Sequence, residues 1–290
     1  MTQAAPRVWK LSDRHVWSLD QPRILAILNL TPDSFSDGGE LSTIAAVIKR
    51  AADCLKQGAD GLDIGGESTR PGSSSVEAEE QIRRVVPAIA AVRRELGDGF
   101  AVTIDTTRAE VARAALDAGA DAINDVSAGV DDPGMFSLAA ARRCGLVLMH
   151  RLRAPSGDVF SHQYVEPPAY EGGVAAIVAD HLDRRARAAL ESGVDRRAIV
   201  LDPGLGFGKT VEQNLELIDQ SPSLRALGFP VISGLSRKSF VAKWAGIDPD
   251  RPPRERAEAT VRLSLVHRAK GADIFRVHDV EAHARALGRG

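Results

Sequence analysis

The stretch Gly58-Ala-Asp-Gly-Leu-Asp-Ile-Gly65 contains the phrase from which the fold can be predicted. Its Gly-Ala-Asp triplet recurs at Gly119-Ala-Asp121 and at Gly271-Ala-Asp273, and Ser192-Gly-Val-Asp195 is a weaker copy. Each copy follows an amphipathic segment and precedes a short apolar run. Because glycine readily adopts the left-handed conformation that ends a helix, each copy predicts a helix C-terminus that leads into a strand. The repetition indicates one α-to-β architecture along the chain.

Eight apolar runs have the length and composition of strands buried in a parallel sheet, and a helical pattern follows each of them. The runs cover residues 23–30, 61–65, 100–104, 122–126, 146–149, 199–202, 229–233 and 274–278. The helical patterns cover residues 44–55, 76–96, 108–118, 133–143, 173–191, 211–227, 253–270 and a short segment from Glu281 onward. Eight β/α units in 290 residues predict an α/β fold. The expected form is a single (β/α)8 TIM barrel, and a doubly wound open sheet is the alternative.

The N-terminal segment, residues 1–22, is polar and has two short apolar runs, Val8–Leu11 and His15–Leu19. Each run contains a tryptophan, Trp9 or Trp17. The pattern predicts a small β-hairpin or cap ahead of the main fold. The barrel domain would then occupy residues 23–290.

The composition is that of an ordinary globular protein, with 44% hydrophobic residues, 26% charged residues and a net charge of −2. This balance provides no general basic field for nucleic acid or a membrane surface, so neither is expected as a partner. No apolar run approaches the ~20 residues of a membrane span and no signal peptide opens the chain, so we expect a cytoplasmic protein. Cys54 and Cys144 lie in apolar surroundings and are expected to be buried thiols rather than disulfide or zinc ligands.

Polar side chains stand where each predicted strand ends. These residues are Asn29, Asp63, Asp105, Asn124, His150, Asp202, Ser236 and Arg276. In a TIM barrel the strand ends and the loops after them form the functional face. A single polar strand end can simply reach solvent, but here every predicted strand has one. The convergence therefore predicts a ligand site at this face.

Three of the strand-end residues, Asp105, Asn124 and Asp202, are predicted to lie lowest in the site. An ionised carboxylate at that depth needs hydrogen-bond donors. A flat heterocycle with adjacent N–H groups, such as a 2-amino-4-oxo pyrimidine edge, offers two parallel donors to one carboxylate. The three residues therefore indicate a floor that binds a heterocycle.

Cationic side chains come from the loops and strand ends around the mouth of the barrel. They are Arg70, Arg237, Lys238, Arg276 and His278. Such a cluster can hold phosphate or diphosphate. Asn29 could supply an oxygen ligand to the Mg²⁺ that commonly accompanies a diphosphate. Ion pairing with local carboxylates is the alternative for the cations, and above all for Arg237.

The segment Ile199–Thr210 is close to two nucleotide-binding motifs but matches neither. A P-loop has glycine at the place that Pro203 occupies. The dinucleotide fingerprint has its third glycine one position after Gly208. The alternating glycines are therefore expected to shape a wall of the site, and Lys209 and Thr210 to begin the next helix.

Seven segments, in order from residue 28 to residue 279, carry motifs of one enzyme family. They are Leu28-Asn-Leu-Thr-Pro-Asp-Ser-Phe-Ser-Asp-Gly-Gly39, Asp63-Ile-Gly-Gly-Glu-Ser-Thr-Arg-Pro-Gly72, Thr103-Ile-Asp-Thr106, Ile123-Asn-Asp125, Asp202-Pro-Gly-Leu-Gly-Phe-Gly-Lys209, Ser236-Arg-Lys-Ser-Phe240 and Arg276-Val-His-Asp279. On these motifs the chain closely resembles the dihydropteroate synthases of folate biosynthesis.

The resemblance implies a TIM-barrel transferase that joins 6-hydroxymethyl-7,8-dihydropterin diphosphate to p-aminobenzoate and releases diphosphate and 7,8-dihydropteroate. It implies that the pterin is held by Asp105, Asn124, Asp202 and Lys238. It implies that the diphosphate is held by Asn29, Arg70, Arg276 and His278, with Mg²⁺ on Asn29. It implies that p-aminobenzoate is held by Thr69, Pro71, Phe207, Lys238 and Ser239.

The resemblance further implies catalytic roles for Asp33, Asp105, Lys238 and Arg276. The loop that carries Asp33 would close over the assembled site together with the loop of residues 68–72. A homodimer and sensitivity to sulfonamide-type inhibitors are also implied. The chain departs from the family pattern after His150, where Met-Gln-Gly is replaced by Arg-Leu-Arg in a proline-containing loop, residues 151–172.

Two other functions share part of this pattern. A non-catalytic paralogue would bind pterins without turnover, and it would be expected to lack Lys238, Arg276 or the Asp33 loop, all of which are present. A methyltransferase that passes a methyl group from folate to a corrinoid would share the carboxylates and the asparagine of the floor. It would have no need for the p-aminobenzoate and diphosphate loops.

Overall fold

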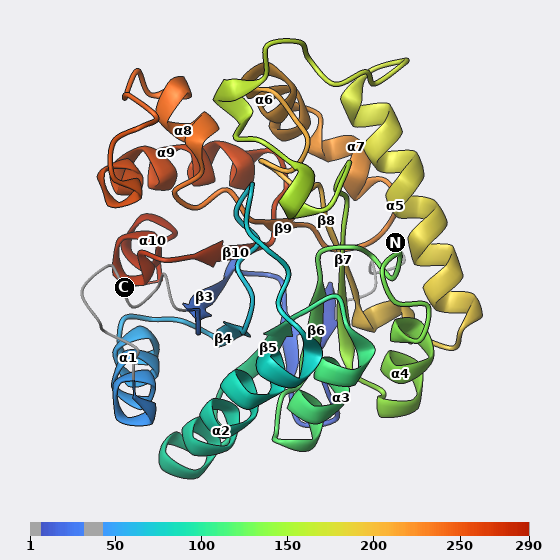
Figure 1. The fold of residues 1–290 in the computed structure, drawn as a ribbon, viewed down its shortest axis with the longest axis vertical. Coiled ribbons are helices and arrows are strands. Elements are labelled where there is room, and N and C mark those ends of the chain that lie inside the picture. Colours follow the sequence, from blue (N-terminus) through green and yellow to red (C-terminus); the bar gives the residue numbers. More distant parts are fainter. Residues whose placement is uncertain (1–6, 32–42, 290) are drawn as a thin grey trace, which may run out of the picture.

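Eight parallel strands make up the central sheet of the computed structural model, which describes residues 7–31 and 43–289 (Figure 1). Neighbouring strands follow the order β8-β7-β6-β5-β4-β3-β10-β9. They are β3 (Arg23–Asn29), β4 (Gly61–Gly65), β5 (Ala101–Asp105), β6 (Ala122–Asp125), β7 (Gly145–Met149), β8 (Ile199–Asp202), β9 (Ile232–Ser233) and β10 (Ile274–Val277). A parallel bridge between Leu201 of β8 and Val231, beside β9, joins the two ends of this order. The sheet therefore closes, and the predicted (β/α)8 barrel is confirmed.

Helices surround the barrel (Figure 1). They are α1 (Ile44–Lys56), α2 (Ala78–Leu96), α3 (Ala109–Asp117), α4 (Met135–Arg142), α5 (Val174–Glu191), α6 (Val211–Asp219), α7 (Ser221–Arg225), α8 (Ser239–Trp244), α9 (Ala257–Ala269) and α10 (Val280–Ala286). The single helix predicted over residues 211–227 is wrong. It is divided into α6 and α7, because Pro222 has no N–H with which to continue the hydrogen bonding of α6. Helix α8 occupies a segment that the sequence predicts as a loop.

The N-terminal segment forms the predicted hairpin, in which β1 (Val8–Lys10) pairs antiparallel with β2 (Val16–Ser18). Trp9 and Trp17 meet edge to face, with ring centroids 5.4 Å apart. Together with Leu11 and Leu19 they pack against one layer of barrel residues near the N-terminal ends of the strands. This layer consists of Leu25, Ala101, Ala122, Val147, Val200, Ile232 and Ile274. The hairpin thus covers the end of the barrel opposite the predicted site.

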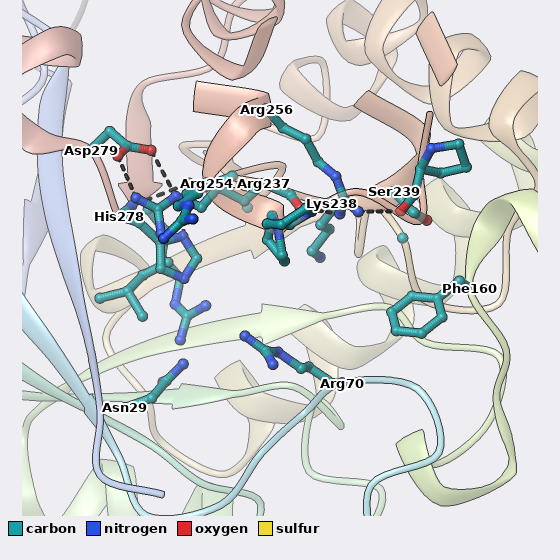
Figure 2. A pocket seen from close by; sticks show the side chains of 18 of the residues that line it. Asn29, Arg70, Phe160, Arg237, Lys238, Ser239, Arg254, Arg256, His278 and Asp279 are labelled. Atoms are coloured by element: carbon teal, nitrogen blue, oxygen red, sulfur yellow. Dashed lines mark hydrogen bonds and ion pairs between the residues drawn. The ribbon is translucent and has the colours of Figure 1, made fainter. Parts of the chain in front are cut away.

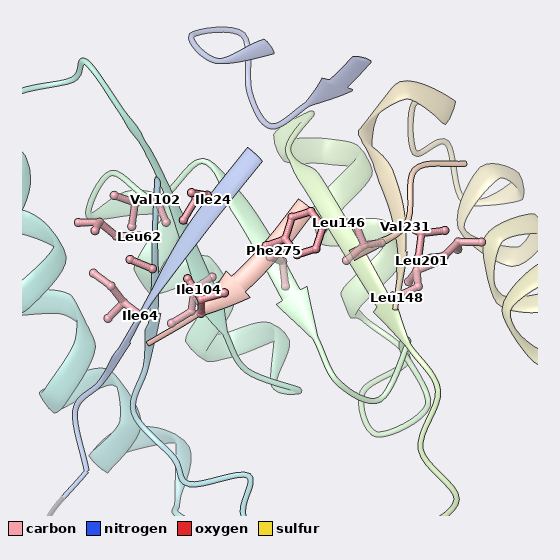
Figure 3. Close-up of a cluster of buried hydrophobic side chains, with 14 of the residues drawn as sticks. Ile24, Leu62, Ile64, Val102, Ile104, Leu146, Leu148, Leu201, Val231 and Phe275 are labelled. Atoms are coloured by element: carbon pink, nitrogen blue, oxygen red, sulfur yellow. The ribbon is translucent and has the colours of Figure 1, made fainter. Parts of the chain in front are cut away.

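Successive strand residues alternate between the barrel interior and the surrounding helices. Those that face the helices form the main hydrophobic core, part of which appears in Figure 3. Leu62 and Ile64 belong to it and are fully buried. Asp63 lies between them and therefore faces the interior, and the same alternation turns Asp105 and Arg276 inward. Above the apolar layer at the hairpin, most of the inward-facing strand residues are polar.

The three Gly-Ala-Asp triplets share one structural role. Each glycine follows a helix and has a positive φ between 104° and 113°. Each aspartate makes two hydrogen bonds with one residue in or directly beside a neighbouring strand. Its backbone N–H donates to the carbonyl of that residue, and its carboxylate accepts from the N–H of the same residue. The pairs are Asp60 with Ile24, Asp121 with Val102, and Asp273 with Val231. Arginines form ion pairs with all three carboxylates, so each triplet fixes a helix end to the start of two strands.

Asp121→Asn is expected to lower the free energy of unfolding by about 3 kcal/mol at pH 7, because it breaks a buried ion pair with Arg93. Burial raises the pKa of Asp121, but the Val102 N–H and Arg93 outweigh it and hold the pKa below its ordinary value. A carboxyl with a lowered pKa stabilises the fold at pH values above its unfolded pKa. The difference in the free energy of unfolding between wild type and Asp121→Asn should therefore vanish as the pH falls below about 4. Chemical unfolding across pH measures it. Asp117→Asn, at an exposed pair with Arg142, is the control, and wild-type stability in Asp121→Asn contradicts the expectation.

Candidate active site

A cavity of about 1120 Å³ opens at the C-terminal ends of the strands (Figure 2). The predicted site residues that line it are Asn29, Thr69, Arg70, Pro71, Phe207, Lys238, Ser239, Arg276 and His278. Asp105 borders a second cavity of about 380 Å³, which also reaches Thr69. Asn124 and Asp202 are buried in the barrel interior. Asp33 and its loop lie outside the described residues.

Asp63 is the centre of a buried hydrogen-bond network inside the barrel. Its carboxylate accepts from the Thr103 hydroxyl and from Asn124 Nδ2, the latter at 3.2 Å. It also accepts from Arg276 Nε at 2.5 Å, and Arg276 Nη2 donates to Asp105 at 2.6 Å. One guanidinium therefore joins two interior carboxylates. No ligand is assigned to Asp63 from the sequence. Its position between the apolar residues Leu62 and Ile64 of one strand is the signal in the sequence that it faces the barrel interior.

Arg276 and the carboxylates beside it influence each other's ionisation. Burial raises the pKa of Asp105 to about 7, although Arg276 opposes the shift. Burial also disfavours the charge on Arg276, but Asp63 and Asp105 outweigh it and raise the pKa of the guanidinium. Arg276 therefore remains a cation, whereas Asp105 can gain or lose a proton near neutral pH.

Lys238 stands between the interior carboxylates and an aromatic wall. Its ammonium lies 4.1 Å from the centre of the Phe207 ring and donates to the Leu205 carbonyl. Burial lowers the pKa of Lys238 to about 7, and Asp202 opposes that shift. Burial raises the pKa of Asp202, although Lys238 and a 2.7 Å hydrogen bond from the Gly204 N–H oppose it. A ligand that donates to Asp202 and accepts from Lys238 would satisfy both groups.

The segment after β9 fixes the orientation of two residues after β10. Ser236 Oγ accepts from the backbone N–H of His278 at 3.2 Å and lies 2.9 Å from His278 Nδ1. The hydroxyl proton can therefore point to Nδ1, which leaves the Nε2 proton for a ligand. Burial and nearby arginines lower the pKa of His278 well below its ordinary value, so the ring is a neutral donor. Arg237 pairs with Asp279 through two hydrogen bonds, at 2.9 and 2.5 Å, so the ion-pair alternative holds for this arginine.

Lys209 is fully buried and turned toward its own loop. Its ammonium donates to the carbonyls of Gly204 and Phe207, each at 2.9 Å, and lies 3.0 Å from His150 Nδ1. Thr210 caps α6 with its side chain, as the sequence predicts. The segment after β8 that contains Gly204, Gly206 and Gly208 is called the glycine loop below. Lys209 binds the carbonyls of this loop, so the near-match to a P-loop is not a phosphate-binding loop in the structure.

Lys209→Met is expected to flatten the rise of stability with pH above neutrality. Burial, with a smaller contribution from Lys238, lowers the pKa of Lys209 to about 7, whereas a lysine in an unfolded chain titrates near 10.4. Between these values the unfolded chain binds more protons, so Lys209 adds about 1.4 kcal/mol per pH unit to wild-type stability. Chemical unfolding from pH 7 to 9 measures the slope. Lys270→Met, at a partly exposed pair with Asp219, should keep the wild-type slope, and parallel profiles for Lys209→Met and wild type contradict the expectation.

The loop of residues 151–172, where the sequence departs from the family pattern, supplies a wall of the main cavity. Phe160 lines it (Figure 2), and so does His162, whose ring stacks on that of Phe160 with centroids 6.0 Å apart. Sequence reasoning missed both residues. No local pattern indicates which side of a long loop will meet another strand end, so the sequence contains no signal for them.

Asn29, at the end of β3, and Arg70 both point into the main cavity in Figure 2. Within the described ranges, no group of three or more His, Cys, Asp or Glu side chains is arranged to hold a metal ion. Mg²⁺ usually takes one or two protein oxygens and completes its shell with phosphate and water. The Asn29 carboxamide therefore fits a Mg²⁺ that binds together with a diphosphate.

The chain matches the family model for pterin-binding enzymes over residues 25–278. A dihydropteroate synthase of Synechocystis is 43% identical over 90% of this chain and 86% of its own length. The structure is similar to that of Xanthomonas albilineans dihydropteroate synthase with 4-aminobenzoic acid, with a TM-score of 0.86 and 39% identity over 98% of this chain and 97% of that chain. A Yersinia pestis dihydropteroate synthase with a sulfonamide drug also has a TM-score of 0.86, at 31% identity and 96% coverage of both chains.

No helix in the described part of the chain is long and apolar enough to cross a membrane. The relatives carry the name that the sequence motifs predict, so the resemblance to this family, the transferase class and the function in folate biosynthesis are confirmed. The chain belongs to the dihydropteroate synthase family of pterin-binding enzymes.

Proposed function

We propose that this protein joins 6-hydroxymethyl-7,8-dihydropterin diphosphate to p-aminobenzoate, with each part of the substrates held at a different depth of the barrel. One observation carries the proposal. Buried carboxylates and Asn124 lie in the barrel interior, Lys238 and Arg276 line the cavity next to them, and neutral or cationic donors surround the mouth. This order matches a heterocycle whose methylene carries a diphosphate.

The pterin would lie on the floor. Asp202 would accept from the two adjacent N–H groups of the ring, while Lys238 and Asn124 would meet its other polar atoms. Arg276 forms an ion pair with Asp105. A pterin that donates to Asp105 would replace this pairing and leave the guanidinium available to the leaving group.

The diphosphate would be held by Arg70, Arg276 and His278, and Asn29 would hold a Mg²⁺ that binds together with it. Mg²⁺ would neutralise part of the charge that the diphosphate gains as it leaves. The two arginines donate as fixed cations. His278 donates from Nε2 as a neutral ring, because Ser236 holds Nδ1.

The p-aminobenzoate ring would lie against Phe207 and Pro71, near the stem of Lys238. Thr69 and Ser239 supply hydroxyl groups for its polar ends. Ser239 is buried at the start of α8, and Phe207, which also lines the cavity, is buried as well. The arylamine nitrogen is a weak nucleophile, so its rate depends on being held close to the pterin methylene.

The reaction breaks the bond between the methylene carbon and the diphosphate oxygen and forms a carbon–nitrogen bond. Negative charge grows on the diphosphate, where Arg276 and His278 donate, and positive charge develops on the methylene near the interior carboxylates. Asp33, on the loop that the motif assigns to closure, would add a negative charge on the side of the methylene. The arylamine loses its proton after attack, and no covalent enzyme intermediate is required.

The remaining family properties are part of the same proposal. A homodimer, a cytoplasmic location and inhibition by sulfonamide-type compounds are expected by resemblance to the family. The Yersinia pestis relative in complex with a sulfonamide drug supports the last of these. Size-exclusion chromatography with light scattering tests the dimer, and competition with p-aminobenzoate tests the inhibitor.

The purified protein should convert the two substrates to 7,8-dihydropteroate and diphosphate in equal amounts when Mg²⁺ is supplied. Chromatography measures the first product, and a coupled pyrophosphatase assay measures the second. A chelator should lower the rate. Pterin binding in calorimetry without product would instead favour the non-catalytic paralogue.

A further inference from the structure

The loop of residues 151–172 lies against the glycine loop that follows β8. It contains two short 3-10 turns, Pro155–Gly157 and Ser161–Gln163. Its direct contacts with the glycine loop fall on Gly208, and it reaches Gly206 through Asn214 of α6; the two glycines are the neighbours of Phe207. Because Phe207 is a wall of the main cavity, whatever holds these glycines also holds that wall.

Asp158 makes the deepest of these contacts. Its side chain belongs to a loop, yet the residue is only 5% exposed. One carboxylate oxygen accepts from the Gly208 N–H at 2.8 Å. The other accepts from the Val159 N–H at 3.0 Å and from the Tyr164 hydroxyl. A buried carboxylate in a loop is unfavourable unless donors surround it, and here they come from both loops.

Two further contacts complete the attachment. The Tyr170 hydroxyl donates to the Gly208 carbonyl at 2.8 Å, so both backbone groups of this glycine are bound from one loop. Asn214 accepts from the Gly206 N–H at 2.6 Å, and its Nδ2 lies 3.1 Å from Ser161 Oγ. A Cβ at Gly208 would lie 2.3 Å from Leu152 Cβ, so the two loops are in direct contact.

We propose that the loop of residues 151–172 is the positioning element for the arylamine wall, and that Asp158 is its main positioning residue. Asp158 does not touch the cavity and acts through Gly208 on Phe207. The inference rests on the proposed function, because Phe207 is assigned to the p-aminobenzoate site there. It applies to a segment in which this chain departs from the family pattern, so it assigns a role to residues that the family motifs do not cover.

Asp158→Asn is the sharpest probe, because it keeps the shape of the side chain. An asparagine has only one acceptor oxygen, whereas the Gly208 and Val159 N–H groups approach different oxygens of Asp158. In either amide orientation, one backbone N–H therefore faces a donor. The KM for p-aminobenzoate should rise about tenfold, with the KM for the dihydropterin diphosphate unchanged. Tyr170→Phe should shift the same constant in the same direction by a smaller factor.

Steady-state kinetics with each substrate varied in turn tests the inference. Asp180→Asn, at an exposed pair with Arg184 on α5, is the matched control and should leave both constants unchanged. Unchanged constants in Asp158→Asn and Tyr170→Phe would overturn the inference. Equal increases in both KM values would also overturn it, because they indicate a general loss of structure. An inactive wild-type protein would instead count against the proposed function.

Discussion

Asp202→Asn is expected to weaken pterin binding by a factor of about 100 or more. A carboxylate can accept from two adjacent N–H groups of the ring, whereas asparagine presents a donor where the second acceptor is required. The loss is large because the site is buried: Asp202 is 5% exposed, and water cannot replace the missing acceptor.

Calorimetric titration with a dihydropterin that lacks the diphosphate isolates this effect from the leaving-group site. Burial raises the pKa of Asp202, so wild-type affinity should fall as the pH is lowered and the carboxylate becomes protonated. The asparagine variant should lose the part of this dependence that comes from Asp202. Asp219→Asn, at an exposed pair with Lys270, serves as the control. Equal pterin affinity in Asp202→Asn and wild type would remove Asp202 from the pocket floor.

Arg276→Ala is expected to lower kcat/KM for the dihydropterin diphosphate on the order of 1000-fold. The variant loses a cation at the leaving group and leaves Asp63 and Asp105 without their shared partner. Breaking a buried ion pair from one side should also reduce the free energy of unfolding by about 3 kcal/mol. Arg276→Lys keeps the charge but cannot bridge two carboxylates. It should therefore retain a larger share of the wild-type stability than of the wild-type activity.

The pH dependence distinguishes this account from a simple loss of packing. Burial raises the pKa of Asp105, and Arg276 opposes the shift, so the alanine variant should have a still higher value. The penalty for an ionised Asp105 is present at high pH and absent once the group is protonated. The stability difference between variant and wild type should therefore shrink as the pH is lowered through about 7. A difference that stays constant from pH 5 to 9 contradicts the ion-pair explanation.

The sequence predicts the barrel well because each of its strands is marked locally. The Gly-Ala-Asp triplets mark helix ends with a glycine and strand starts with an aspartate, and both signals are contained in a few neighbouring residues. The same strand-end logic predicts that Asp105, Asn124 and Asp202 lie low in the barrel, and the structure buries all three. The error over residues 211–227 is also local, since Pro222 marks the break between α6 and α7.

The parts of the site that could not be predicted depend on contacts between distant segments. Arg276 is assigned from its motif to the diphosphate, but the motif contains no sign that the side chain also bridges Asp63 and Asp105. Phe160 lies in a loop of irregular sequence, and only its packing against another loop brings it to the cavity. Local patterns identify which residues reach the strand ends. The hydrogen-bond partners of these residues come from distant strands, and only the closed barrel brings them together.

The N-terminal hairpin packs against strands that are made last, and this has a consequence for the order of folding. Trp9 and Trp17 are buried against a layer that includes Ile232 and Ile274. During synthesis the hairpin emerges before the barrel strands, so these tryptophans cannot reach their final surroundings until β10 has been made. The hairpin is thus made before the barrel but is among the last parts to be buried, and its tryptophan fluorescence reports the completion of the barrel.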